Sequence, residues 1–284
     1  KHFTINELIK RDIIKRRLDN PDDSISYTEF AYALLQGYDF LELYQKKGVD
    51  LQIGSSDQWT NILSGVELIR RKLGKEAFAL CGPLITDASG KKFGKSEGNA
   101  VWLDALKTSP YAFYQFWLQL PDEGLEKYFK VYTFVEISEI ENIMAGHTKN
   151  PGSREAQKAL ALMVTEVVHG TNAAKQAAAA SEVLFGGGAL AELPVDARSM
   201  LLSEVPTLPV LKKDLGSGLT VLDVVATSTL AASKGDARRL IEGKGITLNG
   251  IIVTLDQVLT EADFKNSLAL LKKGKRDIVI LVLK

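Results

Sequence analysis

The sequence has little of what would tie it to an oxidising compartment, a membrane or a polyanion. Cys81 is its single cysteine, which excludes an internal disulfide framework and fits a reducing compartment. No apolar run approaches the 18 residues of a membrane-spanning helix, and residues 1–4 do not begin a signal peptide. Lys and Arg (35) balance Asp and Glu (35), so any argument for nucleic-acid binding rests on local clusters.

What remains is an ordinary globular composition. The 284 residues are 45% hydrophobic, which is enough for two or three domains with a sizeable core. The chain has no initiator Met and runs directly into a helical pattern. We therefore expect it to begin partway through a larger protein.

Two capping boxes, Thr4–Glu7 and Ser26–Glu29, mark helix starts near the N-terminus. The first predicts one helix over residues 5–18, with apolar groups at helical spacing. The second predicts a helix that continues to about Lys46 and stops at Gly48.

An alternation of strands and helices follows. Residues 51–53 are typical of a short buried strand, 54–56 of a turn and 57–73 of a helix. Residues 80–86 are again apolar and extended, and a lysine-rich loop covers 87–99. This order indicates an α/β layer with a parallel sheet.

The remaining chain changes in character twice. Between about 105 and 200 the pattern is helical with short polar breaks, and the clearest segments are 111–117, 138–144, 154–169 and 172–184. Pro and Gly residues between 206 and 218 indicate a linker. The last module, 217–284, has two short helices (221–227 and 234–242), a hairpin signal at Asn249–Gly250 and a closing strand at 278–283.

The lysine-rich loop contains Lys92, Lys95 and Ser96 among several glycines. Ammonium groups neutralise phosphate oxygens, and glycine lets backbone approach a ligand closely. This composition suits a loop that folds over a polyphosphate. A solvated surface turn has a similar composition and is the alternative.

Tyr32, Gln36 and Asp39 lie at i, i+4 and i+7, so they share one face of the predicted helix. A phenol, an amide and a carboxylate in one stripe can hold a small polar ligand by directed hydrogen bonds. The carboxylate would accept from a hydroxyl or an ammonium group. The alternative is an ordinary polar helix face with Tyr32 half-buried.

A second candidate set lies where the first predicted strand meets the following helix. Gln52 and Gly54 belong to the strand and turn, and Asp57 and Gln58 to the helix start. Ligands of open α/β sheets bind outside the C-terminal ends of strands, where Asp57 could accept from ribose hydroxyls and Gln58 could contact a carboxylate or carbonyl oxygen. The alternative is that Asp57 only caps the helix.

The Tyr32–Asp39 stripe, the Gln52–Gln58 turn and the 92–96 loop, in this order, resemble bacterial-type tyrosyl-tRNA synthetases, which are class I enzymes. Further segments share this likeness, which covers essentially the whole chain. The resemblance implies an α/β fold: the C-terminal half of a Rossmann-like class I catalytic domain (1–105), an α-helical domain on the anticodon side (106–205) and a small α+β S4-like RNA-binding domain (217–284).

The resemblance also implies roles for matching residues. Tyr32 and Gln36 would bind the tyrosine α-ammonium group and Asp39 its phenolic hydroxyl, with Gln52 supporting the pocket. Gly54, Asp57 and Gln58 would contact the aminoacyl adenylate. The family's KMSKS loop, which binds ATP and acts in catalysis, matches Lys92, Lys95 and Ser96. Preorganised ammonium groups would stabilise the negative charge that builds on the leaving pyrophosphate.

Two features depart from the family pattern. Ser55 stands where relatives commonly have a second glycine. The HIGH motif is absent, because His2, His147 and His169 form no H-x-G-H pattern and are better explained as surface or packing residues. We therefore expect the HIGH-containing portion to lie upstream of Lys1, and this chain alone to be incomplete for activation.

The last module carries local positive charge, with 10 Lys and Arg residues against 7 Asp and Glu residues from 217 to 284. Lys234, Arg238, Arg239 and Lys244 lie on or beside one predicted helix. A solvated helix face is the alternative. The S4 likeness favours RNA contact, because phosphate binding needs clustered cations.

The sequence thus predicts a tyrosine–tRNA ligase that uses ATP with Mg²⁺, without a tightly bound cofactor or a dedicated metal site. Its partners would be tyrosine, tRNA(Tyr) and a second copy in a homodimer, with no membrane. The location would be the cytoplasm, or alternatively the mitochondrial matrix. The rival hypotheses are a non-catalytic RNA-binding or splicing factor on the same scaffold and a tryptophan-specific relative. Asp39 and the S4-like tail disfavour the latter.

Overall fold

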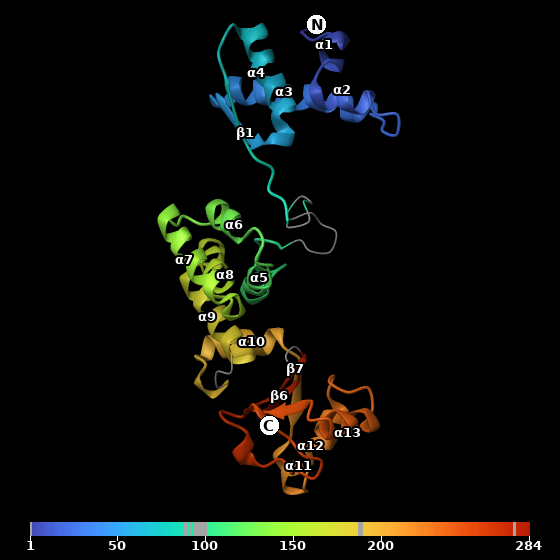
Figure 1. Ribbon diagram of the computed structural model, residues 1–284, viewed down its shortest axis with the longest axis vertical. Coiled ribbons are helices and arrows are strands. Elements are labelled where there is room, and N and C mark those ends of the chain that lie inside the picture. The colour runs from blue at the N-terminus through green and yellow to red at the C-terminus, as the bar shows by residue number, and fades with distance from the viewer. Residues whose placement is uncertain (1, 88–89, 91–92, 94–100, 187–189, 275–276) are drawn as a thin grey trace. The chain divides into compact units, whose positions relative to one another are not determined.

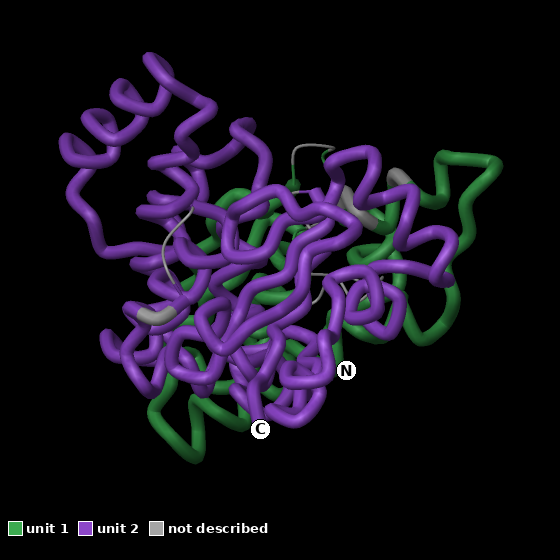
Figure 2. Tube along the Cα trace, turned by 90° about the horizontal axis from the view of Figure 1, so that it is seen from below, with its two compact units in different colours: residues 1–95 green, residues 96–284 purple. Residues whose placement is uncertain are grey.

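The structure is a computed structural model, and it describes residues 2–87, 90, 93, 101–186, 190–274 and 277–284. The chain divides into two compact units, residues 1–95 and 96–284 (Figures 1 and 2). Within the described ranges, no helix has the length and apolar character needed to cross a membrane. The predicted substrate residues 32–58 lie in the first unit, and the predicted RNA-contacting residues 234–244 lie in the second.

The first unit is a small α/β layer. Its described residues form the helices and parallel strands α1 (Ile5–Ile9), α2 (Asp12–Leu18), α3 (Tyr27–Lys47), β1 (Leu51–Ser55), α4 (Trp59–Leu73) and β2 (Phe78–Gly82). Both predicted capping boxes form, and Gly48 ends α3 in the left-handed conformation. The parallel pairing predicted from the strand–helix–strand order is confirmed.

The prediction of one continuous helix over 5–18 is wrong, because the chain breaks at Lys10 and Arg11. Arg11 is extended, with φ −68° and ψ 136°, and α2 begins after it. Helical periodicity continues across the break, so the sequence pattern alone does not reveal it. The Arg11 side chain instead contacts α4, a tertiary interaction that competes with local helix propensity.

Helices α3 and α4 cross closely at two glycines. A Cβ added to Gly37 would lie 3.0 Å from the Ser64 Cβ, and one added to Gly65 would lie 2.6 Å from Phe40 Cδ1. Phe40, Leu41, Leu68, Ile69 and Ala77 form the buried core beside this crossing. Because Gly37 and Gly65 carry no side chain, Ser64 and Phe40 can pack directly against them and α3 and α4 approach closely.

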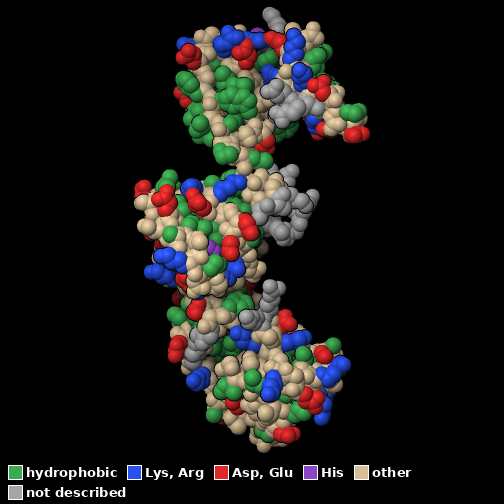
Figure 3. Space-filling view, viewed as in Figure 1, with side chains coloured by type: hydrophobic (Ala, Val, Ile, Leu, Met, Phe, Trp, Pro, Cys, Tyr) green, Lys and Arg blue, Asp and Glu red, His purple; other side chains and the backbone are tan. Residues whose placement is uncertain are grey.

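Successive side chains of β1 point to opposite faces of the sheet. Gln52 and Gly54 alternate with Leu51 and Ile53, and Gly54 lies against α4. The parallel register places Leu51 beside Phe78 and Ile53 beside Leu80, and all four side chains are exposed. Figure 3 shows apolar side chains gathered on the visible face of this unit.

The first part of the second unit is helical. Its helices are α5 (Pro110–Leu118), α6 (Leu125–Tyr132), α7 (Ile137–Lys149), α8 (Glu155–His169), α9 (Thr171–Ser181) and α10 (Val195–Glu204). Helices α5, α8 and α9 pack against one another around buried aromatic and aliphatic side chains (Figure 1). The four predicted helical segments in this region are confirmed, whereas α6 and α10 had no prediction of their own.

The last part of the chain is an α+β module. Its sheet has the order β3 (Thr207–Val210), β7 (Asp277–Leu283), β6 (Leu268–Lys273), β4 (Ile246–Leu248) and β5 (Ile251–Ile252). Helices α12 (Val221–Thr227) and α13 (Lys234–Glu242) share its hydrophobic core, and α11 (Lys212–Gly216) follows β3. The two predicted helices and the Asn249–Gly250 hairpin are confirmed, with φ positive at both turn residues.

The predicted linker between 206 and 218 is not a linker throughout, because it contains β3 and α11. Strand β3 pairs in parallel with β7 at the edge of the sheet. Pro209 fits there because an edge strand has one side without ladder hydrogen bonds. This proline therefore marks an edge strand and not a break between modules.

Candidate functional site

The Tyr32, Gln36 and Asp39 stripe lies on α3. Tyr32 is 54% exposed, Asp39 is exposed and Gln36 is half-buried. Gly37 follows Gln36 and lies against Ser64 of α4, so the stripe flanks the α3–α4 crossing. Phenol, amide and carboxylate groups are therefore available to a ligand on a rigid helix.

Gly54 is the point of close approach between β1 and the start of α4. A Cβ at this position would lie 2.9 Å from Ile62 Cδ1 and 3.0 Å from Gln58 Cβ. A side chain here would push the helix start away from the strand. The glycine therefore fixes how closely Gln58 follows β1.

Asp57 lies in a 3-10 turn, η1 (Ser56–Gln58), between β1 and α4. Its carboxylate accepts a hydrogen bond from the Ser55 hydroxyl and another, at 3.5 Å, from the Gln58 amide. Ser55 at the cap position of η1 and Gln58 at that of α4 make no side-chain cap hydrogen bond, and the capping role of Asp57 stays an alternative. The departure at Ser55 thus gives a direct contact to Asp57 that sequence reasoning missed.

The Gln52 side chain carries a buried polar atom that no described residue pairs with. Its Oε1 atom is buried and has no hydrogen-bond partner among the described residues. Buried polar atoms are generally paired, so an unpaired amide oxygen indicates a missing donor. A ligand could supply that donor.

Within the lysine-rich loop the structure describes three residues, Asp87, Gly90 and Phe93. Lys92, Lys95 and Ser96 lie outside the described residues, so their predicted grouping stays a prediction. Gly90 has a φ of 82°, and the Phe93 amide donates to the Ile85 carbonyl at 3.0 Å. A positive φ at Gly90 is a conformation that favours glycine.

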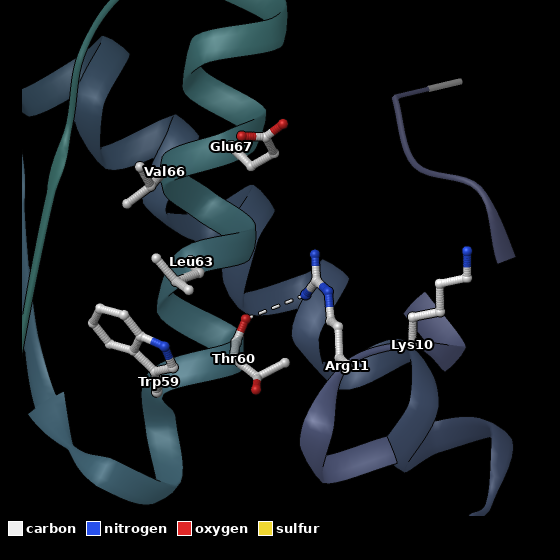
Figure 4. Close-up of a pocket in the computed structure, with 7 residues that line it drawn as sticks. All are labelled: Lys10, Arg11, Trp59, Thr60, Leu63, Val66 and Glu67. Carbon is white, nitrogen blue, oxygen red and sulfur yellow. Dashed lines mark hydrogen bonds between the residues drawn. The ribbon is translucent and has the colours of Figure 1, made fainter. Parts of the chain in front are cut away.

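A cleft of about 430 Å³ lies between the α1–α2 corner and α4 (Figure 4). It is lined by Lys10, Arg11, Trp59, Thr60, Leu63, Val66 and Glu67. Arg11 crosses to α4, where its guanidinium donates to the Thr60 carbonyl at 3.2 Å. Sequence reasoning missed this residue, because an arginine within an apparently continuous basic helix carries no distinguishing signal.

The predicted RNA-contacting residues gather on and just after α13. Lys234, Arg238, Arg239 and Lys244 are all exposed, and Ala237 and Ile241 turn the other face of the helix to the core. Lys234 pairs with Asp223 at 2.7 Å, and Arg239 lies 3.6 Å from Asp236. The exposed face of α13 therefore carries Lys and Arg side chains, and two of these cations already have acidic neighbours. Figure 3 shows Lys and Arg side chains on the visible surface of this module.

Comparison with known proteins identifies the class. The profile of the family "tRNA synthetases class I (W and Y)" matches residues 1–186. The chain therefore belongs to the class I tRNA synthetases and, within them, to the tyrosyl-tRNA synthetase family.

The individual matches extend over nearly the whole chain. It is 42% identical to a tyrosine–tRNA ligase of Anaeromyxobacter dehalogenans over 99% of its length, and 44% identical to one of Bacteroides thetaiotaomicron over 100%. The chain spans 66% and 68% of the length of these two relatives. A crystal structure of a C-terminally truncated Aspergillus nidulans mitochondrial tyrosyl-tRNA synthetase matches with a TM-score of 0.51 and 32% identity, covering 65% of this chain and 52% of that one.

Proposed function

We propose that the full-length protein is a tyrosine–tRNA ligase, which activates tyrosine with Mg²⁺-bound ATP and transfers it to tRNA(Tyr). The observation that carries this proposal is the similarity of the entire chain to tyrosine–tRNA ligases of several bacteria. The placement of the α3 stripe and the β1–α4 turn in one compact unit supports it.

In this proposal the α3 stripe binds tyrosine. Tyr32 and Gln36 accept hydrogen bonds from the α-ammonium group, and the Asp39 carboxylate accepts one from the phenolic hydroxyl. Phenylalanine lacks that hydroxyl, so it would leave the carboxylate without this bond and bind less well. The unpaired Oε1 of Gln52 is the kind of acceptor that a pocket-supporting residue would offer.

The turn before α4 binds the adenylate. Asp57 accepts from ribose hydroxyls, Gln58 contacts the carboxylate side, and the missing side chain of Gly54 leaves room for this approach. Lys92, Lys95 and Ser96 act on ATP. Their ammonium and hydroxyl groups stabilise the charge that develops on pyrophosphate as the carboxylate attacks the α-phosphate.

The second unit serves tRNA. We propose a helical anticodon-side domain over 106–205 and an S4-like RNA-binding domain over 217–284, following a catalytic region over 1–105. The exposed basic residues of α13 and Lys244 contact phosphates of tRNA. The family resemblance also favours a homodimer.

The experiment that tests this function is tyrosine-dependent exchange of pyrophosphate into ATP, measured with the full-length protein. Wild type should catalyse exchange, and Lys95→Ala should reduce kcat by about 100-fold or more, as when one transition-state donor is removed. Lys75→Ala, an exposed lysine just after α4, is the matched control and should retain wild-type exchange. Unchanged exchange in Lys95→Ala would overturn the assigned role of the loop.

Calorimetry with tyrosine separates the ligase from a non-catalytic RNA-binding protein on the same scaffold. The ligase should bind tyrosine, and Asp39→Asn should weaken binding of tyrosine more than binding of phenylalanine. RNA binding without any tyrosine binding would overturn the proposed function.

A further inference from the structure

Asp57 and Gln58 lie at the start of α4, where the residues at the two cap positions make no side-chain cap hydrogen bond. Helix N-termini are commonly fixed by a Ser, Thr, Asp or Asn side chain that binds the first free amides. Here Gln58 occupies the cap position of α4 without such a bond, and Ser55 does the same for the preceding 3-10 turn. Contacts from elsewhere in the fold can therefore help to fix this first turn.

Arg11 supplies such a contact from the break between α1 and α2. Its Nη1 donates to the Thr60 carbonyl at 3.2 Å (Figure 4). It also donates to the Ser64 hydroxyl. The Ser64 hydroxyl in turn donates to the Thr60 carbonyl at 2.9 Å, and Ser64 is fully buried. Arg11, Thr60 and Ser64 thus form a closed network at the first turn of α4.

Arg11 is itself held in place. Its guanidinium lies 5.5 Å from the centre of the Phe3 ring, and the Arg71 guanidinium lies 5.2 Å from the same ring. Arg71 also pairs with Glu7 at 2.8 Å, which ties α1 to the far end of α4. Partial burial lowers the pKa of Arg11 from its ordinary value, although a guanidinium stays charged throughout the physiological range.

We propose that Arg11 is a positioning residue of the activation site, which fixes the first turn of α4 and thereby the placement of Asp57 and Gln58. Thr60 follows Gln58 by two residues, less than one helical turn, so a shift at the Thr60 carbonyl moves both side chains. This inference rests on the proposed function, because it assigns Arg11 a part in using the adenylate site.

The test is pyrophosphate exchange with the full-length protein and four variants, Arg11→Met, Arg11→Lys, Ser64→Ala and Arg17→Met. Arg11→Met should raise the KM for ATP by about 2- to 30-fold, the range of coupling carried through intermediate side chains. The KM for tyrosine should change less. Arg11→Lys keeps a cation and should recover part of the loss, and Ser64→Ala should shift the same constant in the same direction.

Arg17→Met is the matched control, because Arg17 on α2 pairs with Asp23 and Glu29. It should leave both KM values unchanged. A double-mutant cycle with Asp57→Asn adds a second readout: the effect of Arg11→Met on KM should largely disappear when Asp57 is already altered. A purely structural role would lower the active fraction, and hence kcat, without moving KM.

The outcomes are distinct. Active wild type with an unchanged KM for ATP in Arg11→Met, or with additive effects in the cycle, would overturn the positioning role alone. Absence of tyrosine-dependent exchange in wild type would overturn the proposed function, and this inference with it. If Arg11→Met fails to fold, the KM for ATP of Arg11→Lys and of Ser64→Ala tests the positioning role instead. An unchanged KM for ATP in both variants would overturn it.

Discussion

The Glu7 carboxylate connects two elements through one side chain. It completes the capping box of α1 by accepting from the Thr4 amide at 2.9 Å, and it accepts from the Arg71 guanidinium of α4 at 2.8 Å. These bonds, with that from Arg71 the strongest, lower the pKa of Glu7 to about 2. Each bond favours the charged form, so the docking of α1 on α4 depends on ionisation of this carboxyl.

We therefore expect an acid-sensitive contact between α1 and α4. Because the folded-state pKa of Glu7 lies below the ordinary value of 4.5, its stabilising effect is present above pH 4.5 and is lost as the pH falls through about 2. Carboxyl NMR titration should place the Glu7 midpoint near pH 2 in wild type and closer to 4.5 in Arg71→Met. An unshifted midpoint in that variant would show that Arg71 does not hold the carboxylate.

At the scale of elements, the α3–α4 crossing depends on the absence of side chains. Gly65 is a helical residue, and replacing a helical glycine with alanine normally stabilises a helix by up to about 1 kcal/mol. At this position the new methyl group would lie 2.8 Å from Phe40 Cβ as well as 2.6 Å from its ring. Overpacking of this kind typically costs about 1–3 kcal/mol, so the clash outweighs the gain in helix propensity.

Gly65→Ala should consequently lower the free energy of unfolding of the first unit, by about 1–2 kcal/mol. Gly146→Ala is the matched control, since Gly146 is also within a helix but has open space around its Cα. That change should stabilise the second unit slightly. Calorimetric unfolding of the two variants measures both effects, and a stabilised Gly65→Ala would contradict the close crossing.

The bounds of the helices and strands show how much of the fold could be predicted from the sequence. The starts of α1 and α3, and the bounds of α12 and α13, follow from nearby capping and stop residues, so local patterns are sufficient. The break at Arg11 and the edge strand β3 depend on α4 and β7, which are distant in the sequence. Such tertiary contacts override periodicity and proline signals, and no local pattern reveals them.

The candidate site is predictable to a similar extent. The residue types in the α3 stripe and the β1–α4 turn are compatible with a polar ligand, and only their order together with the 92–96 loop favours that interpretation over an ordinary polar surface. The roles of Arg11 and Ser55 are not predictable from the sequence. Each depends on a contact, of Arg11 with Thr60 and of Ser55 with Asp57, that no local pattern reveals. Residue types indicate which groups could bind a ligand. Which other residues hold those groups in position depends on three-dimensional contacts.

For the whole molecule, balanced charge conceals a local asymmetry. The chain carries equal numbers of acidic and basic side chains, yet the exposed face of α13 and the residue Lys244 are basic. Attraction for a polyanion then depends on a few residues and not on the net charge. Their removal should therefore have a large effect on RNA binding without changing the fold.

The double variant Arg238→Gln, Lys244→Gln should weaken tRNA binding and reduce the slope of log affinity against log salt by about 2, one for each phosphate contact. Lys212→Gln with Lys213→Gln removes two exposed charges from α11 of the same module and is the control. Filter binding or fluorescence anisotropy across a salt series gives both slopes. Equal slopes in the two double variants would exclude α13 as a specific phosphate-binding face.

The single thiol of the chain also has a practical consequence. Cys81 is free and partly buried on β2, and the parallel register places it beside Gly54 of the β1–α4 turn. Within residues 1–284, a fluorine label attached there would give one resonance, because this stretch contains no other cysteine. Its chemical shift would report ligand arrival beside Gly54 directly and in solution.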